Sequence, residues 1–330
     1  MDIPRIDIAP FLDGDGTGKR RVAEAVADSC REFGFLVITG HGLDRDALQR
    51  AFALTRDFMD LPQTSKDRWH PKGPSKQRGY HGFATRGLAS TMDAEVPPDL
   101  RETLFLGPVD DHQDHFANLP EARDAYWPNT IPDHPAGIDH ALIAIYRGFE
   151  RLSGDLLRIF ATALAMPEDH FATRIDRHFS ILSCHHYPAL SEAPLPGQLR
   201  TGAHTDFGAM TILAMTDAVT ENGGGLEVRM PDGQWRAVQA GQGELAVNLG
   251  DMMARWTNDR WTSTLHRVAN PDNLADAGSR RQSIGYFMHP NFDARIECLP
   301  TCLDPGSQPR YAPITAGEHI AMKIAKSHNV

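Results

Sequence analysis

Three segments in the first half of the chain carry apolar residues with the period of an α-helix. At 19–34, 45–60 and 138–165, apolar residues return at every third or fourth position and form one stripe along a helix. Asp44 is a good N-cap for the second segment, and Pro62 ends it. We expect each helix to bury its apolar stripe against a common core.

The second half of the chain changes to short β-prone runs separated by turn residues. The Asp-Gly pair in "MPDGQW" suits a tight turn between two paired strands. Two similar runs, "PRIDI" and "FLVIT", lie near the N-terminus. The runs of the second half are "FSILSCHHY", "GAMTILAM", "GLEVRM", "QWRAVQ", "ELAVNL", "STLHRVAN" and "QSIGYFMH". This pattern predicts an α+β fold with a mainly β core, in which helices surround a β-sandwich or barrel.

Residues 70–135 are rich in Gly, Pro and charged side chains, which predicts long loops with a few short elements. The chain contains no internal repeat, low-complexity tract or flexible linker. We therefore expect residues 1–330 to form a single domain. Within it, 1–135 would be an N-terminal helical and loop region, and 136–330 would hold the long helix, the β core and a C-terminal tail.

Charge and cysteine content limit the classes of partner. A formal net charge of -10 without a basic tract argues against nucleic acid or an anionic membrane as partner. The chain has no run of 18 apolar residues, and its start does not resemble a secretory signal. Its four cysteines are too few for a disulfide scaffold, and Cys298 and Cys302 are expected to be packed or loop thiols. We expect a cytoplasmic protein, as a monomer or a homo-oligomer.

The stretch "RTGAHTDFGAMTIL" places His204 and Asp206 two positions apart in a β-prone run. Residues i and i+2 of a strand point to the same face, so both side chains could bind one metal ion. The same pattern occurs at His112 and Asp114, where acidic and polar neighbours predict a solvated loop instead. The context therefore favours the first pair as a metal site.

A third ligand is available in "DRWTSTLHRVANP", where His266 lies in another predicted strand. Two imidazoles and one carboxylate on one face of a metal suit non-haem Fe(II) and leave positions open for other ligands. Further on, Arg281 and Ser283 again occupy positions i and i+2 of a predicted strand, where a guanidinium and a hydroxyl could hold a carboxylate. Arg-x-Ser also occurs as Arg151 and Ser153 in the long helix, which predicts only a solvated face there.

Taken together, these motifs resemble the Fe(II)- and 2-oxoglutarate-dependent dioxygenase superfamily, in its isopenicillin N synthase-like branch. The resemblance covers nearly the whole chain. Its N-terminal part includes "CREFGFLVITGHGL" and "DLRETLFLG", and its second half includes "HYP", "GAHTDFGAMTIL", "NLGDMMARWTNDRWTSTLHRV" and "RRQSIGYF". It implies a double-stranded β-helix, or jelly roll, with iron held by His204, Asp206 and His266.

The resemblance also implies a co-substrate site and a reaction. Arg281, Ser283 and Tyr187 would bind the far carboxylate of 2-oxoglutarate. Decarboxylation of this co-substrate with O2 would be coupled to hydroxylation, desaturation or ring closure of a small-molecule substrate. Many plant relatives have Asn two residues before the tyrosine, where this chain has His185. We expect His185 to pack or to orient its neighbours rather than to contact the co-substrate.

Three alternatives remain open at this point. Isopenicillin N synthase itself keeps an Arg-x-Ser motif without using 2-oxoglutarate, so the chain could be an Fe(II) oxidase of that kind. It could also be a non-catalytic metal-binding sensor on the same scaffold. A zinc protein using Cys298, Cys302 and His289 is the third alternative.

The substrate pocket is expected to draw on three parts of the chain. These are residues 77–93, the position of Phe207 and the segment that follows "MHPNF". Arg86, Arg200 and Tyr80 are candidate contacts, although a surface role is the simpler expectation for each arginine.

Overall fold

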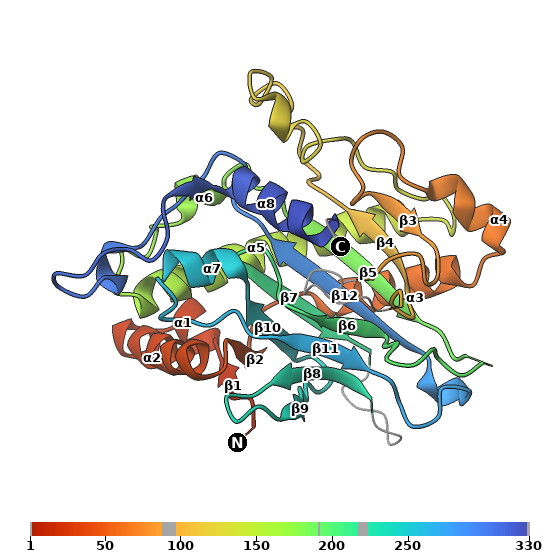
Figure 1. Ribbon diagram of the computed structural model, residues 1–330, viewed down its shortest axis with the longest axis horizontal. Coiled ribbons are helices and arrows are strands. Elements are labelled where there is room, and N and C mark those ends of the chain that lie inside the picture. The colour runs from red at the N-terminus through yellow and green to blue at the C-terminus, as the bar shows by residue number, and fades with distance from the viewer. Residues whose placement is uncertain (1, 88–96, 191, 217–223, 329–330) are drawn as a thin grey trace.

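Two β-sheets face each other at the centre of the molecule, as the computed structural model shows (Figure 1). The structure describes residues 2–87, 97–190, 192–216 and 224–328. The large sheet has the order β1 (Arg5–Asp7), β2 (Phe35–Thr39), β10 (Leu245–Leu249), β7 (Met210–Met215), β12 (Arg281–Met288), β5 (Ile181–Tyr187), β4 (Glu102–Leu106) and β3 (Gly79–His81). The small sheet has the order β6 (Thr201–His204), β11 (His266–Ala269), β8 (Gly225–Arg229) and β9 (Trp235–Ala237).

The strand pairing is antiparallel throughout both sheets except between β1 and β2, which run parallel. A short third sheet pairs β13 (Arg295–Ile296) with β14 (Ile314–Thr315). The helices are α1 (Ala9–Leu12), α2 (Gly16–Glu32), α3 (Arg45–Met59), α4 (Gln63–Lys66), α5 (Ile138–Ala163), α6 (Ala172–Ile175), α7 (Asp251–Trp256) and α8 (Ala316–His328). This arrangement confirms the predicted α+β fold with a mainly β core, and it is the jelly roll that the resemblance implies.

Strand β2 shows why the large sheet lies between two layers. All its apolar side chains are buried, but they alternate between two separate clusters. Leu36 and Ile38 pack with the helices on one face. Phe35 and Val37 pack with residues of the small sheet on the other face. The large sheet therefore separates a helical layer from the interior of the jelly roll.

The helical layer forms where the apolar spacing predicts it. Helices α2 and α3 both contact α5, and α5 in turn contacts β12. The Asp44 carboxylate accepts hydrogen bonds from the backbone N–H groups of Asp46 and Ala47 at 2.9 and 3.1 Å, so the predicted N-cap is confirmed. No helix in the described ranges is long and apolar enough to span a membrane.

One local prediction is confirmed and another needs correction. Strand β4 is one of the few short elements predicted within residues 70–135, and it joins the large sheet because Leu104 and Leu106 are buried against the helical layer. Ser153 is buried rather than solvated, and its hydroxyl donates to the Glu150 carbonyl oxygen at 2.7 Å. Positions i and i+2 of a helix point in nearly opposite directions, so Arg151 is exposed while Ser153 faces inward.

A buried polar network joins the N-terminal region to the end of the jelly roll that carries Arg281. The Glu102 carboxylate accepts hydrogen bonds from Lys66 Nζ and His186 Nδ1, each at 2.8 Å, and from the Tyr80 hydroxyl. Arg280 Nε donates to His186 Nε2 at 2.8 Å, which fixes the proton of this imidazole on Nδ1. Glu102 and Lys66 are both almost fully buried. The network therefore links α4, β3, β4, β5 and the start of β12.

We predict that Glu102→Gln destabilises the protein by about 3–5 kcal/mol, because it leaves the Lys66 ammonium buried without its negative partner. The free energy of unfolding from urea titration at pH 7 measures this loss. Glu102→Gln combined with Lys66→Met removes both charges and should recover much of the stability. Equal stability of the single variant and the parent protein would contradict the prediction.

The contact between Glu102 and Lys66 also predicts how the destabilisation by Glu102→Gln depends on pH. Burial opposes ionisation of Glu102, but the hydrogen bonds from His186, Lys66 and Tyr80 outweigh it and lower the pKa of the carboxyl. A lowered pKa in the folded state stabilises the protein above the unfolded value of about 4.3. This contribution is lost as the pH falls through the folded value. The stability difference between parent and Glu102→Gln should therefore shrink below about pH 4.

Candidate functional site

The two predicted histidine ligands are brought together by one strand pair. His204 ends β6 and His266 begins β11, and the two residues are direct partners in the antiparallel register. Asp206 lies beyond the end of β6, so the prediction that it shares a strand face with His204 was wrong. The chain leaves the sheet after His204, and the carboxylate reaches the histidines from the loop that follows.

These three residues form a compact and buried donor set. Asp206 Oδ1 lies 3.5 Å from His204 Nε2, and Asp206 Oδ2 lies 3.8 Å from His266 Nε2. One ligand atom from each residue lies within 4.8 Å of the others. Each residue is only 5 or 6% exposed. Among the described residues, this is the one group of His, Cys, Asp and Glu side chains that meets this spacing.

Backbone carbonyl groups select the tautomer of both imidazoles. His204 Nδ1 lies 2.8 Å from the Gly202 oxygen, and His266 Nδ1 lies 3.0 Å from the Thr264 oxygen. A carbonyl oxygen can only accept, so Nδ1 of each ring carries the proton. In a neutral ring the lone pair is then on Nε2, and the Nε2 atoms of both histidines face the carboxylate where a metal ion would bind.

The Asp206 carboxylate is held by two side chains of the large sheet. Thr211 Oγ1 on β7 and Asn248 Nδ2 on β10 donate to its Oδ2 atom at 2.5 and 2.7 Å. Burial alone would raise the pKa of Asp206, but His266, His204 and Asn248 overcome it and hold the pKa well below its usual range. Burial, reinforced by His204, lowers the pKa of His266 to about 4. The site therefore presents an ionised carboxylate and a neutral imidazole at His266.

The predicted co-substrate residues come from two neighbouring strands of the large sheet. Arg281 pairs with Tyr187, and Ser283 pairs with His185, in the register of β12 and β5. All four residues are buried, and they line one cavity together with His204, Asp206 and His266. The Arg281 guanidinium and the Ser283 hydroxyl therefore line the same cavity as the His-Asp-His group.

His185 lies among polar side chains on this face. Its Nδ1 atom lies 3.0 Å from Thr103 Oγ1 and 3.3 Å from Arg101 Nη1, and its Nε2 atom lies 2.9 Å from Ser183 Oγ. Burial and the nearby Arg101 charge lower the pKa of His185 well below its ordinary value. A neutral imidazole in this position can orient its neighbours without adding charge to the cavity.

Several cavity residues were missed by the sequence analysis. Arg101 enters from the segment before β4, and its guanidinium forms an ion pair with buried Asp99 at 3.1 Å. Thr211 and Asn248 are polar residues inside strands that are otherwise apolar, and this contrast in the sequence could have identified them as candidate site residues. The remaining wall is mostly apolar and consists of Leu213, Met215, Leu226, Val268 and Phe287, together with the polar residues Thr201 and Gln282.

The residues suggested for substrate contact lie elsewhere. Arg86, Arg200, Tyr80 and Phe207 are not among the described residues that line this cavity. Arg200 is 1% exposed, so the expectation of a surface role for it was wrong. Residues 88–93 of the suggested segment fall outside the described residues.

The alternative zinc site receives no support from the described part of the chain. Cys298, Cys302 and His289 do not come together as a metal-ligand group there. All four cysteines are free thiols, as expected for Cys298 and Cys302.

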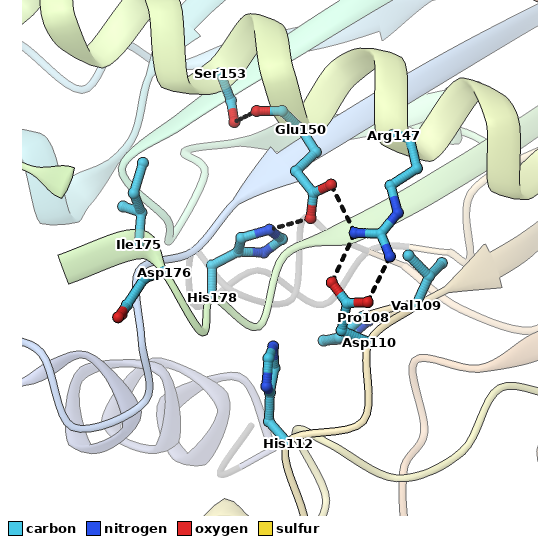
Figure 2. Close-up of a pocket in the computed structure, with 10 residues that line it drawn as sticks. All are labelled: Pro108, Val109, Asp110, His112, Arg147, Glu150, Ser153, Ile175, Asp176 and His178. Carbon is cyan, nitrogen blue, oxygen red and sulfur yellow. Dashed lines mark hydrogen bonds and ion pairs between the residues drawn. The ribbon is translucent and has the colours of Figure 1, made fainter. Parts of the chain in front are cut away.

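A second pocket, of about 270 Å³, lies on the helical side of the large sheet (Figure 2). Arg147 on α5 bonds to the carboxylates of both Asp110 and Glu150, and Glu150 also accepts from His178 Nε2 at 2.8 Å. His112 and Asp114 lie in a loop, as predicted, and Asp114 is exposed, but His112 is half-buried because its side chain points into this pocket. These charges largely satisfy one another, which distinguishes this pocket from the open His-Asp-His group.

We predict that Asn248→Leu weakens Fe(II) binding about 10–100-fold, because it removes a hydrogen bond that orients the Asp206 carboxylate. Anaerobic titration with Fe(II) measures the change. Asn129→Leu is the matched control, since the Asn129 amide bonds only to the backbone of Gly107 and Pro108, remote from the cavity. Unchanged iron affinity in Asn248→Leu would show that Asp206 does not depend on this contact.

Family models match both parts of the chain. One described as non-haem dioxygenase in morphine synthesis N-terminal matches residues 3–134, and one for the 2OG-Fe(II) oxygenase superfamily matches residues 178–290. A 2-oxoglutarate-Fe(II) type oxidoreductase, hxnY of Emericella nidulans, is 32% identical over 98% of this chain and 90% of its own length. Homoarginine-6-hydroxylase of Oryza sativa is 28% identical over 98% and 96% of the two chains.

Solved structures that resemble this chain come from the same family of oxygenases. A full-length Neurospora crassa protein crystallised in complex with alpha-KG, that is 2-oxoglutarate, superposes with a TM-score of 0.84. It is 30% identical, and the match covers 98% of this chain and 95% of the other. The His-Asp-His group, the two-sheet core and these relatives lead to one conclusion: the chain belongs to the Fe(II)- and 2-oxoglutarate-dependent oxygenase superfamily, in its isopenicillin N synthase-like branch.

Proposed function

We propose that His204, Asp206 and His266 hold the Fe(II) of this 2-oxoglutarate-dependent oxygenase. The observation that carries the proposal is the convergence of two Nε2 atoms and one carboxylate within 4.8 Å in a buried cavity. This donor set suits non-haem Fe(II) and leaves positions for 2-oxoglutarate and O2. When bound, the iron supplies the oxidising chemistry that couples co-substrate decarboxylation to attack on an unactivated C–H bond.

We further propose that Arg281, Ser283 and Tyr187 bind the far carboxylate of 2-oxoglutarate. Their cross-strand pairing places a guanidinium and two hydroxyl groups on the face of the large sheet that lines the cavity. A planar guanidinium can hold a carboxylate with two hydrogen bonds. His185 would keep these groups in place through Thr103 and Ser183 rather than bind the co-substrate itself.

The whole chain, 1–330, would act as one catalytic domain. The N-terminal region, 1–135, contributes β1 to β4 to the same sheet as β5, β7, β10 and β12 of the 136–330 region. A strand-paired boundary of this kind is part of a domain core rather than a flexible junction.

The substrate that we propose is a small organic molecule and not a nucleic acid. The formal net charge of -10 disfavours a phosphate backbone, and the cavity combines an apolar wall with the Arg101 cation. The Neurospora crassa protein has also been crystallised with thymine, and a rice relative of 25% identity is a dioxygenase for auxin oxidation. The free state of all four cysteines is consistent with the reducing cytoplasm that we propose as its compartment.

We predict that His204→Ala and Asp206→Ala each abolish tight Fe(II) binding and turnover, because each removes one of three protein ligands. Iron content after anaerobic loading and desalting tests the first effect, and succinate release tests the second. His112→Ala is the matched histidine control and should retain iron, since His112 lies in the separate pocket on the helical side. Full activity in either ligand variant would refute this assignment.

We predict that Arg281→Ala weakens 2-oxoglutarate binding while iron stays bound. The visible charge-transfer band that forms when 2-oxoglutarate chelates Fe(II) reports on this step in an anaerobic titration. Arg295→Ala, which alters an exposed arginine paired with Glu297, serves as the control. An unchanged affinity for 2-oxoglutarate in Arg281→Ala would remove Arg281 from the proposed site. Absence of the band in the iron-loaded parent protein would contradict chelation itself.

A further inference from the structure

A second buried guanidinium, that of Arg200, lies beside the proposed co-substrate residues. Arg200 directly precedes β6 and is 1% exposed. Its backbone N–H donates to Asn270 Oδ1 at 2.9 Å, and its Nη2 atom donates to the Ser279 carbonyl oxygen. The first contact holds the backbone of Arg200 next to the small sheet, and the second holds one nitrogen of its guanidinium.

Among the described residues, few groups compensate the positive charge of the Arg200 guanidinium. Its Nε and Nη1 atoms are buried and have no hydrogen-bond partner in the described ranges. No carboxylate among the described residues forms an ion pair with it. A buried cation without an anionic partner is costly for the folded state. An anion bound nearby would reduce that cost.

The surroundings of Arg200 point to such an anion. Its guanidinium carbon lies 5.8 Å from the centre of the Tyr187 ring, within reach of a cation–π contact. The Tyr187 hydroxyl lies 3.3 Å from Oγ1 of Thr201, the residue that follows Arg200. Arg281 is the strand partner of Tyr187. Tyr187 therefore contacts Arg200 through its ring and is the strand partner of Arg281.

The two arginines also influence each other directly. Burial, and after it the like charge of Arg281, lowers the pKa of Arg200 to about 10. Arg200 therefore remains cationic at neutral pH, as arginine side chains do in general. Neighbouring cations repel each other, and a negatively charged ligand relieves that repulsion.

We propose that Arg200 is a positioning residue for 2-oxoglutarate. It supports the Tyr187 ring and adds a second positive charge next to Arg281, and so strengthens binding of the far carboxylate. Arg200 is not among the described residues that line the cavity. It therefore acts through the position of Tyr187 and through the electrostatic attraction of its charge, without touching 2-oxoglutarate. This inference rests on the proposed roles of Arg281 and Tyr187.

Calorimetric titration of the Mn(II)-loaded protein tests the proposal without turnover. Two ligands are compared: 2-oxoglutarate, and 2-oxopentanoate, which has the same chelating end but a methyl group in place of the far carboxylate. Arg200→Gln should lower the affinity for 2-oxoglutarate about tenfold, as expected for loss of a desolvated cation–π contact and one nearby charge. Its affinity for 2-oxopentanoate and for Mn(II) should stay unchanged.

Two further variants separate this effect from damage to the fold. Arg200→Lys keeps the positive charge, and a Lys ammonium can also make a cation–π contact, so this variant should bind 2-oxoglutarate within about threefold of the parent protein. Arg78→Gln is the matched control, because Arg78 is equally buried and its hydrogen bonds within the described part of the chain go to the backbone oxygens of Gln77, Ala125 and Trp127. It should alter thermal stability and leave both ligand affinities unchanged.

The results that would overturn the inference are distinct. Unchanged 2-oxoglutarate affinity in Arg200→Gln would remove Arg200 from the site. Equal loss of both keto acids, in Arg200→Gln or in Arg200→Lys, would reduce its role to general support of the fold. If the parent protein itself failed to bind 2-oxoglutarate, the proposed function would fail before the question of Arg200 arose.

Discussion

The antiparallel pairing of His204 with His266 is the constraint on which the rest of the site depends. One pair of strands in the small sheet brings two imidazoles from distant parts of the sequence face to face, with ring centres 4.4 Å apart. A slip of one residue would turn one of these side chains to the opposite face of the sheet. The backbone carbonyls of Gly202 and Thr264 then select the tautomer of each ring. The register therefore sets the position of the histidine ligands, and local backbone contacts orient them.

The large sheet completes this arrangement from the other side. It supplies Thr211 and Asn248 to hold the Asp206 carboxylate, and it supplies the paired faces of β5 and β12 that carry Tyr187 and Arg281. The carboxylate is costly to bury, and its hydrogen bonds and the nearby imidazoles offset that cost before any metal binds. Such preorganisation lets metal binding proceed with little rearrangement of the ligands.

The local sequence pattern was sufficient to predict much of the fold and to identify the chemically distinctive residues of the site. Apolar spacing identified α2, α3 and α5, and β-prone runs identified most strands of the jelly roll. His204, Asp206, His266, Arg281 and Ser283 carried a recognisable order of side-chain types, and the structure places all of them around one cavity.

The errors arose where tertiary contacts decide the outcome. The strand run after "GAHTD" suggested that Asp206 lay on β6, but the chain turns away directly after His204. Arg200 was expected at the surface because the local sequence does not show that it is buried and hydrogen-bonded to Asn270 and Ser279. Burial of this kind depends on segments far apart in sequence.

Anomalous X-ray diffraction at the iron edge, from anaerobic crystals of the Fe(II)-loaded protein with 2-oxoglutarate, tests the central claim most directly. The account predicts one strong iron peak within bonding distance of His204 Nε2, Asp206 and His266 Nε2, with the far carboxylate of 2-oxoglutarate on Arg281. An iron peak away from these three residues, or a co-substrate carboxylate that does not reach Arg281, would contradict it.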